Sequence, residues 1–93
     1  QPNKNEMGFI LHPNYQNPFN TSTTISFELQ NPANVEFRVV DVMGRELTRI
    51  NYGQKAAGNY QYQVNADNWA SGVYFYTLRV NDQLQSRSML LVK

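Results

Sequence analysis

The chain of 93 residues has no cysteine and only one histidine. Without cysteine there is no disulfide framework and no thiol nucleophile, and the redox compartment is left open. His12 lies beside Pro13, ahead of the first expected strand, which favours a surface position over a general base. No serine stands in a Gly-x-Ser-x-Gly elbow, and the carboxylates are dispersed along the chain. The composition therefore argues against an enzyme.

An excess of charge and long apolar runs are also missing. Eight Lys and Arg against seven Asp and Glu give a formal net charge of +1, and the basic residues form no stripe. This distribution argues against a nucleic-acid partner. No apolar run approaches the roughly 20 residues that a membrane-spanning helix needs, so we predict no transmembrane segment.

The length supports a single domain. Residues 1–6 lack the basic opening and the apolar core of a signal peptide and have the composition of a polar linker. We expect residues 1–8 to link the domain to an upstream passenger in a larger precursor. Residues 9–93 are then the folded domain.

What the sequence does contain is a series of short β-branched and aromatic runs, separated by clusters of Asn, Gly, Pro and Asp. Helix signals are nearly absent, so the pattern is that of an all-β protein. About seven strands at this spacing predict an antiparallel, immunoglobulin-like β-sandwich. The strands that we can place from alternation are residues 24–29, 35–42, 46–51, 60–64, 73–81 and 84–92.

Some positions depart from regular alternation. The apolar phase reverses at Val40 and Val42, which predicts a bulge or burial on both faces. Residues 53–58 are expected to form a loop, and Asn81-Asp82 a tight hairpin turn. No internal repeat is evident.

The aromatic residues allow two interpretations. Tyr60, Tyr62, Tyr74 and Tyr76 fall on the alternation that faces the core, where tyrosine commonly buries its ring. Together with Trp69 and Phe75 they could instead form a sugar-stacking platform. An exposed pair of Trp69 and Phe75 would favour ligand binding.

Two short polar segments have weak functional readings. Residues 65–68 could offer oxygen ligands to calcium, but a turn between strands is favoured. Residues 20–22 match a glycosylation acceptor pattern. We predict no metal site and no cofactor.

Two turn-forming blocks, residues 14–20 and 71–76, lie near opposite ends of the chain, and an apolar run at 89–92 precedes Lys93. In this order, these segments resemble the C-terminal sorting domain of the type IX secretion system, the Por secretion system tail domain. That family has a leucine, an Asn-Tyr-Pro-Asn-Pro-Phe-Asn block and a Thr-rich strand start, which correspond to Leu11 and residues 14–20 and 21–25. The family continues with a strand into a glycine turn, here residues 39–46, and an Ala-Gly pair, here residues 57–58. Its Ser-Gly-Val-Tyr-Phe signature stands at residues 71–75, and its closing apolar strand with lysine at residues 89–93.

The likeness covers residues 11–93, with two departures. Gln16 replaces the first proline of the block, which makes that turn less rigid. Trp69 stands where the family usually has a smaller aliphatic residue, which would enlarge the core or expose an aromatic ring.

The resemblance implies a cleavable secretion signal of Bacteroidetes-type bacteria, which directs a passenger through the periplasm and across the outer membrane to the cell surface. It implies recognition by the translocon and its outer-membrane shuttle protein. A sortase-type cysteine peptidase would then cut in or upstream of residues 1–8 and join the passenger to an anionic lipopolysaccharide. The recognition residues that the motif match carries over are Asn17, Pro18, Phe19, Asn20, Gly44, Gly72, Tyr74 and Lys93. The alternative is a generic immunoglobulin-like accessory or carbohydrate-binding module of a secreted enzyme.

Most of these residues also have a structural interpretation. Pro18 and Phe19 would fix the start of a strand and cap the core, and Tyr74 would pack inward. Gly44, Gly58 and Gly72 would permit a positive φ or a close backbone approach. Lys93 has no place in a core. The strand that precedes it is expected at or near a sheet edge, where a partner could add a strand.

Overall fold

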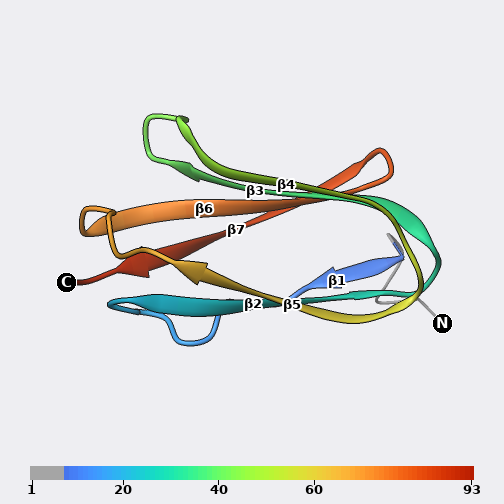
Figure 1. The fold of residues 1–93 in the computed structure, drawn as a ribbon, viewed down its shortest axis with the longest axis horizontal. Helices are drawn as coiled ribbons and strands as arrows, with labels where there is room; N and C mark the ends of the chain where they lie inside the picture. The colour runs from blue at the N-terminus through green and yellow to red at the C-terminus, as the bar shows by residue number, and fades with distance from the viewer. Residues whose placement is uncertain (1–7) are drawn as a thin grey trace, which may run out of the picture.

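A computed structural model describes residues 8–93 as two antiparallel sheets packed face to face (Figure 1). The three-stranded sheet has the order β1-β2-β5, and the four-stranded sheet has the order β4-β3-β6-β7. No helix occurs in the described part of the chain, and the predicted seven-stranded β-sandwich is confirmed. Of the expected linker, residues 1–7 lie outside the described residues. The strands are β1 (Phe9–Leu11), β2 (Ser22–Leu29), β3 (Ala33–Asp41), β4 (Glu46–Lys55), β5 (Gly58–Asn65), β6 (Gly72–Val80) and β7 (Gln83–Leu91).

Alternating side chains build the core. In β2, Ile25, Phe27 and Leu29 point inward and are at most 4% exposed, while the residues between them are partly exposed. Aromatic rings from the two sheets meet between the layers: the Phe27 ring centroid lies 6.2 Å from that of Tyr52 in β4, and the Phe37 ring centroid lies 5.2 Å from that of Tyr62 in β5. The core is therefore continuous across both layers.

The four core-facing tyrosines lie where alternation predicts. Tyr74 and Tyr76 are buried, and Tyr60 and Tyr62 are half-buried against the core. Burial raises the pKa of the Tyr76 hydroxyl, which donates a hydrogen bond to the carbonyl of His12. The buried rings of Tyr74 and Tyr76 are therefore not available to a sugar-stacking platform.

Strand β4 corrects one prediction. It runs to Lys55, so the expected loop at residues 53–58 is reduced to the two residues before β5. Gly53 lies within the strand at a φ of 68°, next to a register shift in the pairing with β3. A glycine that resembles a loop signal in the sequence thus serves as a bulge residue.

The irregularity expected in β3 is present as well. The pairing of β3 with β4 shifts register between Val39 and Val40, and β3 ends at Asp41. Val42 therefore belongs to the following turn and is exposed. The bulge reading of the reversed phase is confirmed.

Although no internal repeat is predicted, a short one stands at the start of two strands. Residues 56–60 and 70–74 both read Ala-x-Gly-x-Tyr. In each, the tyrosine hydroxyl donates to the carbonyl of the alanine four residues earlier, at 2.5 Å for both Tyr60 and Tyr74. The hydroxyl thereby pins the chain as it enters the strand, an arrangement like the tyrosine corner of immunoglobulin-type sandwiches.

The sandwich has two distinct ends along its longest dimension of 41 Å (Figure 1). One end carries the loop of residues 12–21, the β3–β4 turn at 41–45, the loop of residues 66–71 and residues 92–93. We call it the motif end. The opposite end carries Gly8 and the turns between β2 and β3, β4 and β5, and β6 and β7, where the Gln30 amide donates to the Gly8 carbonyl at 3.0 Å. The expected Asn81-Asp82 hairpin turn is found there.

Candidate recognition surface

The loop of residues 12–21 connects the two sheets at the motif end. Tyr15 forms an antiparallel bridge with Thr24 of β2, and Phe19 forms a parallel bridge with Leu91 of β7. The Ala66 amide also donates to the carbonyl of Thr21 at 2.8 Å, which ties the loop to the β5–β6 connection. One loop thus closes the end of the sandwich.

The Asn17–Phe19 segment clamps the end of β7. The Phe19 amide donates to the Leu90 carbonyl at 3.0 Å, and the Val92 amide donates to the Phe19 carbonyl at 2.8 Å. A third hydrogen bond joins the same segments: the Leu90 amide donates to Asn17 Oδ1 at 2.9 Å. The Phe19 side chain is 4% exposed and belongs to the core, as predicted. We call this segment the clamp.

Gln16, the departure from the family block, is held by its neighbours. Its carbonyl accepts hydrogen bonds from Asn14 Nδ2 at 3.0 Å and from Thr23 Oγ1 at 2.8 Å. Asn14 and Thr23 are both buried and also bond to each other. Two polar side chains therefore fix the backbone where the family has a proline.

Gly44 lies in the β3–β4 turn, which is organised by Asp41. The Asp41 carboxylate accepts hydrogen bonds from the amides of Met43 and Arg45, both at 2.9 Å, and from Arg45 Nε at 2.8 Å. Desolvation alone would raise the pKa of Asp41, but the hydrogen bonds from Arg45 and Met43 outweigh it and lower the pKa. Gly44 adopts a φ of 83°, which glycine permits without a Cβ penalty.

Gly72 and Tyr74 lie at the start of β6, facing the same end. Gly72 pairs with Leu91, and Tyr74 pairs with Asp41 on one side and Met89 on the other. The Tyr74 ring is 7% exposed and packs on Trp69, with centroids 5.0 Å apart. Trp69 is half-buried against the core, whereas Phe75 is exposed on the outer face of the four-stranded sheet. No contact between the Trp69 and Phe75 rings is found in residues 8–93.

Lys93 is exposed but held by the β5–β6 loop. Its amide donates to Ser71 Oγ at 2.9 Å, and its ammonium donates to the Asp67 carbonyl at 2.6 Å. The loop begins with a turn in which Asn65 Oδ1 accepts the amide of Asp67 at 3.1 Å. The turn interpretation of residues 65–68 is confirmed, and no cluster of three or more metal-ligating side chains is found in the described range.

The eight residues carried over from the motif match therefore come from four segments that meet at the motif end (Figure 1). Asn17, Phe19 and Lys93 contact other motif-end residues directly, while Asn20 projects as an exposed side chain. The recognition residues carried over do not include those that organise this end, which are Asn14, Thr23, Asp41, Asp67 and Ser71. Asn14 and Ser71 lie within the two turn-forming blocks. Asp41 had a local signal of its own, because an aspartate at the start of a glycine turn commonly caps the following amides.

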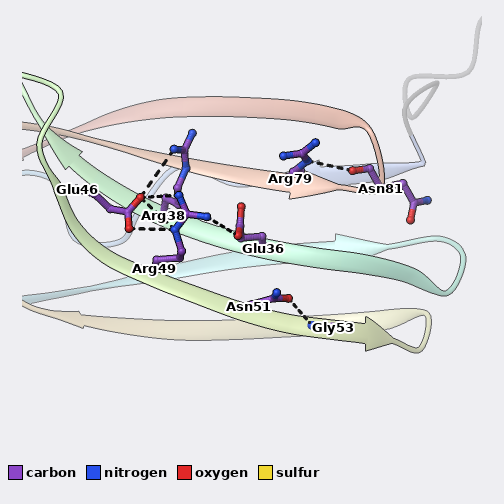
Figure 2. A network of polar contacts seen from close by, with 8 residues as sticks. All are labelled: Glu36, Arg38, Glu46, Arg49, Asn51, Gly53, Arg79 and Asn81. Atoms are coloured by element: carbon purple, nitrogen blue, oxygen red, sulfur yellow. Dashed lines mark hydrogen bonds and ion pairs between the residues drawn. The ribbon is translucent and has the colours of Figure 1, made fainter.

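A charged network lies on the outer face of β3 and β4, starting at Glu46 next to the β3–β4 turn (Figure 2). Arg49 pairs with Glu36 and with Glu46, at 2.8 Å in each case. The hydrogen bond from Arg49 lowers the pKa of Glu46, and the same contact raises the pKa of Arg49. All three side chains are partly exposed, so the network contributes modestly to stability.

Comparisons with known proteins identify a matching family. The family model described as "Secretion system C-terminal sorting domain" matches residues 14–93. A comparison with curated proteins found no matching relative. Among residues 8–93, no helix has the length and apolar character needed to cross a membrane.

Proposed function

This chain belongs to the family of secretion system C-terminal sorting domains, and we infer its function from that family. Such a domain is the C-terminal sorting signal of the type IX secretion system, and this chain is one. The family is not catalytic. The chain interacts with the type IX system and serves secretion to the cell surface or beyond it.

We propose that the specific partners are the translocon and its outer-membrane shuttle protein, reached from the periplasm. After passage across the outer membrane, a sortase-type cysteine peptidase would remove the domain and anchor the passenger to a lipopolysaccharide. In this proposal the domain is a substrate of the peptidase and supplies no catalytic group.

We propose residues 9–93 as the unit that is recognised and residues 1–8 as the linker that holds or follows the cut. Two observations support this division. Strand β1 begins at Phe9, whose side chain is buried in the core. Gly8 lies at the end of the sandwich opposite the clamp, bonded to Gln30. A passenger attached there would leave the motif end accessible.

The observation that carries the proposal is the clamp, which brings residues 17–19 against residues 90–92. The motifs of the family lie far apart in the sequence, and only the folded domain gathers them into one surface. We therefore propose that the translocon recognises the folded motif end, with Asn17, Asn20 and Lys93 among its contacts.

The test is a fusion of residues 1–93 to the C-terminus of a periplasmically exported reporter. We expect the reporter at the cell surface in a host with a type IX system, and in the periplasm of the same host lacking its translocon. A folded, protease-resistant fusion that stays in the periplasm of the complete host would contradict the proposal.

A further inference from the structure

The two edges of the four-stranded sheet differ in how they are protected. The β4 edge carries Glu46, Arg49 and Lys55 and is interrupted by two register shifts in its pairing with β3. Charges and bulges are the usual means of preventing an edge from pairing with another chain. The β7 edge pairs with β6 in one unbroken register from Gln83 to Leu91, without a bulge.

The clamp identifies which backbone groups of β7 face outward. The amide and carbonyl of Leu90 bond to Asn17 and Phe19, on the side away from β6. In an antiparallel ladder, outward-facing groups recur at every second residue. Since the register is unbroken, the amides and carbonyls of Leu84, Ser86 and Ser88 also face outward.

These outward positions are uncharged and accessible. Leu84, Ser86 and Ser88 are exposed, and among residues 8–93 no hydrogen bond to their backbone from beyond the edge is found. The one charge of β7, on Arg87, points across to β1, where its Nε donates to the Leu11 carbonyl at 2.8 Å. Gln85 accepts from the Leu11 amide at 3.0 Å, so these two side chains cover the β1 edge and leave the β7 backbone uncovered.

The clamp also shows that this edge binds a chain. Residues 17–19 lie along the end of β7 and form one isolated parallel bridge, between Phe19 and Leu91. Beyond the clamp, residues 84–88 leave an open length of roughly 17 Å. The open length is thus continuous with the proposed recognition surface.

We propose that residues 84–88 of β7 receive an extended, uncharged segment of a secretion-system component by strand addition. Main-chain hydrogen bonds to Leu84, Ser86 and Ser88 would provide affinity, and alternate side chains would provide specificity. The small Ser88 stands beside the exposed Phe75 on the neighbouring strand, which leaves room for an apolar side chain of the incoming strand. This inference rests on the proposed sorting function and names where on the domain its partner binds.

The test compares Ser86→Pro with Ser86→Ala in the reporter fusion. Proline removes the outward amide and is tolerated where that amide faces solvent. Alanine keeps the amide and, like proline, loses the hydrogen bond between the hydroxyls of Ser86 and Thr77. We expect surface display to fall about tenfold with Ser86→Pro, as the loss of one good main-chain contact implies, and to stay at the wild-type level with Ser86→Ala.

A folding control accompanies each variant, because a misfolded signal would also fail. Thermal unfolding of purified residues 1–93 should give similar midpoints for the two variants. If Ser86→Pro does not fold, Ser88→Lys takes its place, since it puts a charge beside the open edge and leaves every amide intact. We expect Ser88→Lys to fold and to reduce display, with Ser88→Ala as its control.

Three outcomes would overturn the inference. In the first, the folded proline or lysine variant is displayed like the wild type. In the second, the alanine control fails equally. In the third, residues 1–93 form a dimer that Ser86→Pro abolishes while display is unchanged, so that the edge pairs with a second copy. If the wild-type fusion itself is not displayed, the sorting function has failed instead.

Discussion

At the scale of single residues, two side chains that are largely withdrawn from solvent hold the motif end in shape. Asp41 satisfies the amides of the β3–β4 turn, and Tyr74 anchors the start of β6 through the Ala70 carbonyl. The two residues are paired across neighbouring strands. Substitutions of Asp41 or Tyr74 should therefore impair sorting by destabilising the fold and not by removing a contact with the partner.

Two variants of Tyr74 separate the stability that its ring packing contributes from the stability that its hydroxyl hydrogen bond contributes. Tyr74→Phe removes only the hydroxyl and should cost about 1 kcal/mol of unfolding free energy. Tyr74→Ala also removes the buried ring and should cost about 3–5 kcal/mol. Urea unfolding of both variants checks this, with Tyr15→Ala as the control, because Tyr15 is 75% exposed. Equal costs for the Tyr74→Phe and Tyr74→Ala variants would contradict the burial described for its ring.

Asp41 makes the stability of the domain depend on pH. Its pKa is lowered from an ordinary value of 3.8, since the folded turn favours the carboxylate. The stabilisation is therefore complete above pH 3.8 and is lost as the pH falls through the folded pKa.

We expect Asp41→Asn to be less stable than the wild type at neutral pH, and the difference to shrink in acid as the wild-type carboxylate is protonated. Unfolding midpoints of both proteins, measured over a pH series, give the result. A difference that stays constant across the series would show that the charge of Asp41 contributes nothing.

At the scale of elements, alternation predicted the long strands and the inward tyrosines, because a half-buried strand repeats every two residues. Strand β1 was not placed in advance, since its three residues are too few for a pattern. The sequence alone predicts a loop at Gly53, because nothing local separates a glycine in a bulge from one in a turn.

The clamp could not be predicted in detail either. The hydrogen bond between Asn17 and Leu90 joins residues 73 positions apart, and a parallel bridge between a loop and a strand has no sequence period. The family motif located both segments, and the expected edge position of β7 is confirmed. Only the fold shows that the two segments touch.

The clamp gives a local prediction at this scale. Asn17→Ala removes the acceptor of the Leu90 amide and should lower stability by only about 1 kcal/mol. Hydrogen exchange should nevertheless become faster at Leu90 and Val92, while Met89, buried beside them, stays protected. Unchanged exchange at Leu90 would mean that Asn17 does not hold this strand.

At the scale of the whole molecule, the two ends have separate tasks in our account. The passenger joins at the Gly8 end, and recognition takes place at the motif end, along a dimension of 41 Å. Exposed residues should then matter for sorting according to the end on which they lie. Burial alone would predict no such difference, because exposed substitutions at either end leave the core intact.

The most direct test compares two double variants of the reporter fusion. Asn20→Ala with Lys93→Ala changes exposed residues at the motif end, and Asn59→Ala with Asp82→Ala changes exposed residues at the opposite end. Both proteins should unfold within a few degrees of the wild type. The measurement is the fraction of reporter displayed at the cell surface. Our account predicts a strong loss for the motif-end pair and none for the opposite pair. Equal display of the two folded variants would contradict it.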